Sequence, residues 1–394
     1  MSITHPSADQ SRDVRIGGEI RISRVEDVRE DRLDVLWSDG GRSQYWAHWI
    51  RLRATAAGLF TGVARNWSDG ANFHPQQRLV SESDRIERAH TAGGGAYLVV
   101  TWRDGTSDRL AAPDIWSAEH DDPARRIERK TWSSTKTWPS WDFGPLIEDP
   151  SREVLLAFLT FYLEHGVALI SNVPRRVDSL ARVAGGIAAL APSHLGDAFD
   201  IRTTDNPKHI GEVAAGIPLH IDLVYRQFPP SVQALHAINQ IEDGGENELV
   251  DIHHILGQMA PEDIELLSTI PVDFVARSTS VHFRGRHPVL QFDLDGNFTG
   301  VAYNQYKISF PPSVPPAYYF AFERFRRMIH APENVNRMRI PQDAVLVFDN
   351  RRTLHGRRSF RDTSRHVIGC FLSDDDLRSR YRLLAEAASG GQLA

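Results

Sequence analysis

The chain has 394 residues, of which 41% are hydrophobic and 24% charged, a balance that is ordinary for a globular protein and argues against wholesale disorder. Its 45 basic and 51 acidic side chains give a formal charge of −6, which excludes a globally basic nucleic-acid-binding protein. The single cysteine, Cys370, excludes an intramolecular disulfide and a cysteine-rich zinc site, so any metal chemistry has to use histidine, carboxylate and water.

The N-terminal residues predict neither a secretory signal nor a membrane anchor. Residues 1–15 are polar and have no apolar core. The longest apolar run, residues 154–163, is about half of the roughly 20 residues needed to span a bilayer. We therefore expect a cytoplasmic protein without a membrane partner.

The first 120 residues are rich in short β-type runs. Two of them, Val35–Ser43 and Val100–Ser107, share a Trp-x-Asp-Gly segment, and Asp-Gly is a strong signal for a tight turn. This echo fits two unrelated hairpins as well as an internal duplication, and the sequence leaves both open. Either one predicts a small β-rich N-terminal domain over residues 1–120, followed by a charged linker over residues 121–140.

A different texture begins near residue 141 and continues to residue 394. The apolar side chains of residues 152–165 lie on one face of a predicted helix, which Gly166 ends, and residues 167–171 follow as a buried strand. Many short strands with few helices and Gly/Pro turns predict a mostly β fold with α decoration, a sandwich or jelly roll. Further helices are expected over residues 179–190, 261–267 and 317–330, and strands over residues 232–238, 249–251, 289–293, 344–348 and 366–372.

His220 and Asp222 are the first candidates for chemistry. Side chains two residues apart on a strand lie on the same face, so both can bind one ion. His355, just after the predicted strand of residues 344–348, is the candidate for a third ligand. Two histidines and one carboxylate on one side of a metal leave its other positions open, a pattern that suits non-haem Fe(II).

A buried arginine would complete such a site. If a keto acid chelates the iron, its far carboxylate needs a cationic partner, and arginine offers a bidentate fork. Arg365 directly precedes the predicted strand of residues 366–372 and can reach the same interior. Arg357 and Arg358 compete for this role, although their place directly after Gly356 favours bracing a turn or facing solvent.

Motifs along most of the chain share one resemblance. The string Asp349-Asn-x-Arg-x-x-His-Gly-Arg-Arg-Ser359 and the pairs His220-x-Asp222 and Arg365-His366 resemble the gamma-butyrobetaine hydroxylase branch of the taurine dioxygenase superfamily. The Trp-x-Asp-Gly segments and Trp46-x-x-Trp-Ile-Arg51 resemble the small N-terminal domain of that branch. Further matches are Gly211-Glu-Val, Pro230, Leu235-His236 and Gly244-Gly245.

The resemblance implies a double-stranded β-helix (jelly roll) catalytic domain over residues 141–394 and an enzyme that uses Fe(II), 2-oxoglutarate and O2. It implies that His220, Asp222 and His355 are the catalytic metal ligands, and that Arg365 binds the distal carboxylate of 2-oxoglutarate. The keto acid would be converted to succinate and CO2 while an unactivated C–H bond of the substrate is hydroxylated or otherwise oxidised.

The sequence departs from the branch in its N-terminal domain. That domain often binds zinc through three cysteines that follow the Trp-Leu-Arg stretch, plus a histidine. The corresponding residues 50–57 contain no cysteine, so we expect no structural zinc.

The substrate pocket departs as well. Founding members of the branch enclose a trimethylammonium group in an aromatic cage, and the corresponding positions here are Leu195, Phe199, Glu212 and Phe371. Only two of these are aromatic, which disfavours gamma-butyrobetaine and trimethyllysine as substrates. A polar, amine- or amino-acid-like molecule suits Glu212 better. The candidate substrate residues are Phe199, His209, Glu212, Tyr225, Asn304 and Phe371. Of these, Asn304 fits a turn as well, and Tyr225 fits a lid or the core.

We expect a small-molecule substrate and no nucleic acid, and a homodimer is one state open to the chain. Two other functions remain open: a protein or peptide hydroxylase on the same scaffold, and a non-enzymatic module that binds a metal or a small molecule. Formation of succinate from 2-oxoglutarate separates the enzyme from the binding module.

Overall fold

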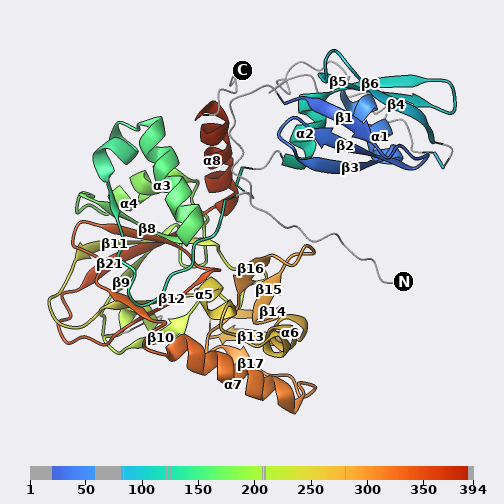
Figure 1. The fold of residues 1–394 in the computed structure, drawn as a ribbon. Helices are drawn as coiled ribbons and strands as arrows, with labels where there is room; N and C mark the ends of the chain where they lie inside the picture. Colours follow the sequence, from blue (N-terminus) through green and yellow to red (C-terminus); the bar gives the residue numbers. More distant parts are fainter. Residues whose placement is uncertain are drawn as a thin grey trace. The chain divides into compact units, whose positions relative to one another are not determined.

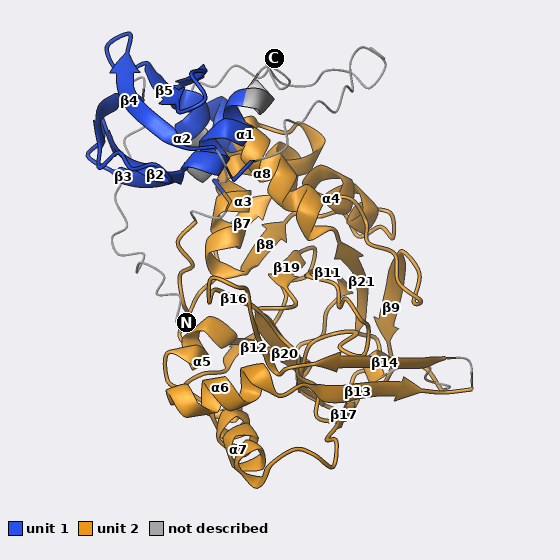
Figure 2. Ribbon diagram, turned by 90° about the vertical axis from the view of Figure 1, so that its right-hand side faces the viewer, with its two compact units in different colours: residues 1–123, 385–394 blue, residues 124–384 orange. Residues whose placement is uncertain are grey.

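A computed structural model describes residues 20–57, 81–82, 84–120, 123–124, 127–205, 207, 210–279 and 281–388 of the chain. The chain divides into two compact units, residues 1–123 with 385–394 and residues 124–384 (Figure 2). Among the helices that the structure describes, none is long and apolar enough to cross a membrane.

The first unit repeats one arrangement of three antiparallel strands followed by a helix (Figure 1). Each set of strands forms its own sheet, in the orders β1-β2-β3 and β4-β5-β6. Apolar side chains of both sets share one core, which includes Val35 and Val100. The elements are β1 (Ile22–Glu26), β2 (Arg32–Trp37), β3 (Arg42–Trp46), α1 (Ala47–Ala57), β4 (Ile86–Ala92), β5 (Tyr97–Trp102), β6 (Ser107–Ala111) and α2 (Ala112–His120).

The two echoed sequence segments occupy equivalent places in this repeat. Trp37 and Trp102 each end the middle strand of their sheet and are 2% and 1% exposed. In the turns that follow, Gly40 and Gly105 have φ angles of 86° and 79°, a left-handed conformation that favours glycine. The echo that the sequence left open therefore corresponds to a repeated unit of structure rather than to two unrelated hairpins.

Arg51 of α1 is the buried polar centre of this unit. Its guanidinium donates to the Asp104 and Asp108 carboxylates, at 2.6 and 3.0 Å, and lies 4.6 Å from the centre of the Trp102 ring. The side chain is 3% exposed, so these contacts compensate a charge that has lost its water. Arg51 thus connects the helix of the first repeat to the turn of the second.

Two facing sheets form the jelly roll of the second unit. The larger has the strand order β7-β8-β19-β11-β21-β9 and the smaller the order β10-β20-β12-β18. Side chains from both sheets, such as Leu235, Phe348 and Leu249, meet in one apolar cluster between them. The strands are β7 (Ser140–Asp142), β8 (Val167–Ser171), β9 (Ala198–Arg202), β10 (Ile217–His220), β11 (Val232–Asn239), β12 (Asn247–Asp251), β18 (Asn336–Met338), β19 (Val345–Asp349), β20 (Thr353–Arg357) and β21 (His366–Leu372).

The outer faces of both sheets are covered. Helices α3 and α4 pack on the larger sheet. On the far side of the smaller sheet, Val250 and Leu354 pack into a second core with helices and short hairpins. The remaining elements are η2 (Gly144–Glu148), α3 (Arg152–His165), α4 (Ser179–Ile187), η3 (Ile210–Glu212), α5 (Ile252–Leu256), α6 (Pro261–Thr269), β13 (Val272–Arg277), β14 (His282–His287), β15 (Leu290–Phe292), β16 (Phe298–Val301), β17 (Ile308–Ser309), α7 (Pro316–His330) and α8 (Asp374–Ala388).

This arrangement confirms the predicted fold class, a mostly β jelly roll with α decoration and a small β-rich N-terminal part. The predicted helix 152–165 and the predicted strands 167–171 and 366–372 have the observed limits. The helix predicted over 179–190 ends at Ile187, because Leu190 forms a β-bridge with Leu372 instead.

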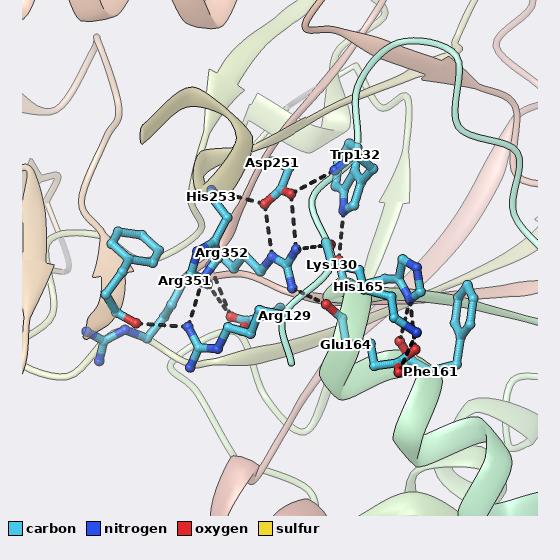
Figure 3. Close-up of polar contacts among 12 residues, drawn as sticks. Arg129, Lys130, Trp132, Phe161, Glu164, His165, Asp251, His253, Arg351 and Arg352 are labelled. Atoms are coloured by element: carbon cyan, nitrogen blue, oxygen red, sulfur yellow. Dashed lines mark hydrogen bonds and ion pairs between the residues drawn. The ribbon is translucent and has the colours of Figure 1, made fainter. Parts of the chain in front are cut away.

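Residues 127–139 contain no helix or strand, yet they pack against the rest of the second unit. Figure 3 shows Trp132 and the main chain of Lys130 beside a buried ion pair, Arg352 with Asp251. The pair is 3% and 0% exposed and is bidentate, at 2.9 and 3.0 Å. Arg352 also donates to the carbonyls of Lys130 and Glu164, each at 2.7 Å, and the Trp132 N–H donates to Asp251 at 3.2 Å. The predicted linker of residues 121–140 therefore contains a buried tryptophan that packs in the apolar cluster of the larger sheet.

We expect Arg352→Met to destabilise the second unit strongly. The change leaves the Asp251 carboxylate buried without its cation, which costs about 3–5 kcal/mol. Arg326→Met is the matched control, because Arg326 pairs with Glu323 at the surface, where the two side chains are 45% and 38% exposed, and such pairs contribute at most about 1 kcal/mol. Urea unfolding followed by circular dichroism measures both. Equal midpoints for the two variants would contradict the role given to the Arg352–Asp251 pair.

Candidate metal centre

The register between β10 and β20 brings the predicted ligands together. His220 lies directly opposite His355 in this antiparallel pair, and their ring centres are 4.2 Å apart. Asp222 follows two residues later, with its Oδ1 3.2 Å from His220 Nε2 and 3.9 Å from His355 Nε2. Within the described ranges, these three side chains form the one group of His, Cys, Asp and Glu whose ligand atoms lie within 4.8 Å of one another.

Neighbouring groups orient the two imidazole rings. His220 Nδ1 lies 2.9 Å from the Pro218 carbonyl, a hydrogen bond that orients the ring and leaves Nε2 facing Asp222. The His355 ring packs between His220 and Phe348, whose ring centre is 4.9 Å away. Both Nε2 atoms therefore face one point.

Asp222 is held by side chains at both its main chain and its carboxylate. The Asn350 amide accepts the Asp222 N–H at 2.8 Å and donates to the Asp222 carbonyl at 3.2 Å. Gln233 Nε2 donates to Asp222 Oδ2 at 2.7 Å, which leaves Oδ1 for a metal. Sequence reasoning gave neither residue a role. A glutamine within the apolar strand of residues 232–238 is the signal that would have pointed to Gln233.

The electrostatics suit metal binding. Burial and the neighbouring charge of His220 lower the pKa of His355 to about 3, so this ring is neutral at physiological pH. Burial opposes ionisation of Asp222, but its hydrogen bonds to His220 and Gln233 and the two neighbouring imidazoles outweigh burial and keep the pKa of the carboxyl below its usual value. Neutral imidazole and ionised carboxylate are the forms that coordinate a cation, and two such nitrogens with one carboxylate oxygen suit Fe(II).

The three arginines that compete for the keto acid differ sharply in their surroundings. Arg365 is 2% exposed, and its Nε and Nη1 have no hydrogen-bond partner among the described residues. Arg357 is also buried but donates to three main-chain carbonyls, whereas Arg358 is exposed. Burial lowers the pKa of Arg365 to about 10, so it stays charged at neutral pH and lacks an anion. A carboxylate fits these unpaired donors.

Asn247 is a further polar residue of this interior that the sequence did not reveal. Asn247 is on β12 and lies opposite Arg357 of β20. Leu249, the next residue on the same face of β12, lies opposite His355. Its Nδ2 is buried without a partner in the described part of the chain. Gly245, two residues earlier, lies so close to Arg365 that an added Cβ would be 3.2 Å from its Nε. Asn247 therefore faces the same interior as the unpaired arginine.

Three of the predicted substrate residues are aromatic, and each of them forms a ring pair in the structure. Phe199 and Phe371 form a pair with ring centres 5.3 Å apart, and Phe371 lies opposite Gln233. Tyr225 stacks on Phe283 at 5.7 Å, and burial raises its pKa to about 12.

The other three predicted substrate residues differ in how the structure describes them. Asn304 lines a small pocket with His220, and its Oδ1 also accepts the Tyr306 N–H, so it shapes a turn as well. Glu212 lies in η3, and His209 lies outside the described residues.

Comparisons with known proteins point to one family. The sequence model described as "Taurine catabolism dioxygenase TauD, TfdA family" matches residues 142–371. The gamma-butyrobetaine dioxygenase of Pseudomonas sp. (strain AK-1) is 29% identical over 369 residues, which cover 89% of this chain and 93% of that protein. The mitochondrial trimethyllysine dioxygenase of Bos taurus is 27% identical over 305 residues, 73% of this chain and 72% of that one. A solved structure of the non-heme iron oxygenase OrfP with Fe and alpha-ketoglutaric acid has a TM-score of 0.48 and 16% identity, over 61% of this chain and 96% of that chain.

Replacing His220, Asp222 or His355 by alanine should each abolish metal-dependent turnover and leave the fold intact. Each change removes one of three ligands and should weaken Fe(II) or Mn(II) binding by about 10²-fold or more, since even the partners of ligands typically contribute 10–100-fold. Anaerobic titration calorimetry measures the affinity. The exposed His282 on β14 provides the control variant, His282→Ala. Full activity of Asp222→Ala would show that the ligand set is wrong.

Gln233→Leu should weaken metal binding by about 10–100-fold, the usual cost of removing a group that orients a ligand. The reason is that Asp222 Oδ2 loses its donor and the carboxylate can rotate. Gln44→Leu, at an exposed position of the first unit, is the matched control. If the two variants bind Mn(II) equally well, Gln233 does not position Asp222.

Proposed function

The chain belongs to the TauD, TfdA family of 2-oxoglutarate-dependent dioxygenases, and we propose that it oxidises an unactivated C–H bond of a small polar molecule, amine- or amino-acid-like in character. The observation that carries this proposal is the pairing, in one interior, of the His220–Asp222–His355 group with the unpaired guanidinium of Arg365.

In this proposal His220, Asp222 and His355 hold Fe(II), and Arg365 holds the distal carboxylate of 2-oxoglutarate. Fe(II) with 2-oxoglutarate supplies the activation of O2, with conversion of the keto acid to succinate and CO2. The chain's own residues orient the metal ligands and exclude water from the site. Asn350 and Gln233 fix Asp222 so that one carboxylate oxygen points to the metal, and the apolar cluster between the sheets keeps bulk water from the reacting atoms.

The substrate side of the pocket supports a molecule with polar or cationic groups. The relatives include dioxygenases of gamma-butyrobetaine and trimethyllysine, but only Phe199 and Phe371 of the four cage positions are aromatic here. We propose that these two rings line the pocket together with Tyr225 and Asn304, and that the Glu212 carboxylate takes an ammonium group. His209 completes the proposed set.

We assign residues 141–394 to the oxygenase domain, residues 1–120 to the N-terminal domain and residues 121–140 to the connection between them. The family match over residues 142–371 supports the first of these limits. A cytoplasmic location and a homodimer stay predictions.

The test of this function is succinate formation by the purified protein from Fe(II), 2-oxoglutarate and O2, alone and with a panel of small amines and amino acids. We expect slow turnover without a panel compound and coupled turnover with one of them. A protein that binds the metal but neither binds 2-oxoglutarate nor forms succinate would be a binding module instead.

Arg365→Ala should raise the 2-oxoglutarate requirement by about 10²-fold or more. Two charge-assisted hydrogen bonds are lost, each worth roughly 1.5–3 kcal/mol, and 1.4 kcal/mol is tenfold. Arg365→Lys should recover only part, because an ammonium cannot reproduce the fork. Iron content should not change. Titration of 2-oxoglutarate in the succinate assay measures the requirement, and the exposed Arg358→Ala is the matched control. A shift in Arg358→Ala without one in Arg365→Ala would move the anchor to Arg358.

A further inference from the structure

We propose that Arg357 is a positioning residue that holds the segment Gly211–Gly216 from inside the jelly roll, and so sets the wall of the substrate pocket beside His220. The part of this inference that concerns substrate rests on the proposed function. The part that concerns the segment rests on geometry alone.

The side chain of Arg357 comes from the same face of β20 as His355, because residues two apart on a strand share a face. From there its guanidinium donates to three main-chain carbonyls of one short segment: Gly211 at 3.3 Å, Ala215 at 2.8 Å, and Val213 in between. The guanidinium also lies 4.6 Å from the centre of the Phe360 ring, which fixes its plane. One buried cation thus donates hydrogen bonds to alternate carbonyls of the segment. Between the end of η3 at Glu212 and the start of β10 at Ile217, the segment contains no helix or strand.

This segment connects directly to the metal centre. Gly216 is followed by β10, which ends at His220, and Ile217 of β10 lies opposite Arg357 itself. Ile210 and Ile217, at the two ends of the segment, line the small pocket that contains His220 and Asn304. The segment also carries Glu212, the proposed partner of an ammonium group. A movement of its main chain would therefore change the substrate side of the pocket.

The other main-chain hydrogen bonds described for this segment have neutral donors. Ala215 and Gly216 are exposed, and residues 211–214 are half-buried. Its main chain is also bonded through the Ala214 carbonyl to the Phe360 N–H at 3.1 Å, and through the Glu212 carbonyl to the Thr204 N–H at 3.2 Å. Hydrogen bonds from a charged donor are stronger than these neutral ones. Among the hydrogen bonds described for this segment, those from Arg357 are therefore the strongest.

The role of Arg357 differs from that of its neighbours in the chain. Among the described residues, Arg365 has no partner for its Nε and Nη1, whereas Arg357 lacks a partner only at Nε and donates from both Nη atoms to carbonyls. Arg358 is exposed and points away from the interior. We therefore expect substitution of Arg357 to affect the segment and the substrate, and to leave 2-oxoglutarate binding close to that of the wild type.

Hydrogen–deuterium exchange of the full-length protein tests this directly. Arg357→Met should raise the exchange rate of the amides whose hydrogen bonds depend on this segment, those of Thr204, Val213 and Phe360, by about tenfold or more, since even one lost charged hydrogen bond corresponds to about a factor of ten in local opening. Arg357→Lys should give an intermediate rate, because an ammonium keeps the charge but cannot span three carbonyls. Arg358→Met is the matched control and should match the wild type.

The same variants are compared for binding of 2-oxoglutarate in the presence of Mn(II), and for KM with the panel compound that supports coupled turnover. We expect 2-oxoglutarate affinity within about threefold of the wild type and a KM for the panel compound raised about tenfold in Arg357→Met. If Arg357→Met does not fold, Arg357→Lys carries the comparison.

Three results would overturn the inference: unchanged exchange at the amides of Thr204, Val213 and Phe360, an equal rise in Arg358→Met, or loss of 2-oxoglutarate binding in Arg357→Met as severe as in Arg365→Ala. The last result would make Arg357 a cosubstrate anchor. A wild-type protein that fails to bind 2-oxoglutarate would sink the proposed function, yet the contrast in exchange between the Arg357 and Arg358 variants would still decide whether Arg357 holds the segment.

Discussion

The register of β10 against β20 is the constraint on which the site depends, because it sets His220 opposite His355. A slip by one residue would turn every side chain of a strand to the other face and destroy the metal centre. The structure fixes β20 at both ends with buried cations. Arg352, just before the strand, is locked to Asp251, and Arg357, its last residue, holds the segment that leads into β10. A slipped register would also leave these buried charged groups without their hydrogen-bond partners, which is costly.

The buried arginines of the second unit differ in how their charge is balanced, and the difference separates structure from function. Arg352 has a carboxylate and two carbonyls, and Arg357 has three carbonyls. Arg365 is equally buried but keeps two unpaired donor atoms in the described structure. A buried donor without a partner costs about 1–3 kcal/mol, more for a charged group. A dicarboxylate that binds at Arg365 would supply the missing hydrogen-bond partners. Its binding should therefore also stabilise the unit against unfolding.

The grouping of His220, Asp222 and His355 was predictable because the signals of these residues are local or lie in one contiguous string. His220 and Asp222 are two residues apart on a strand, and His355 stands in the Asp-Asn-x-Arg-x-x-His string. The residues that orient them were not predictable in this way. Gln233, on β11 of the larger sheet, bonds Asp222, which follows β10 of the smaller sheet. Asn247 lies beside Arg357 only because β12 pairs with β20. Likewise Trp132 sits in a polar stretch, and only tertiary contacts show that it is part of the core.

The two sides of the site are built from different kinds of structure, and this explains why the chemistry is easier to infer than the substrate. The metal side stands on paired strands, in which backbone hydrogen bonds fix each side chain. The proposed substrate side combines Glu212, Tyr225 and Asn304, which lie outside the paired strands in three separate parts of the chain. A change of sequence in one of these segments moves a pocket wall without moving a metal ligand. Arg357 ties the segment that carries Glu212 to β20, so its contacts limit how far this proposed wall can change while the register that aligns the metal ligands stays fixed.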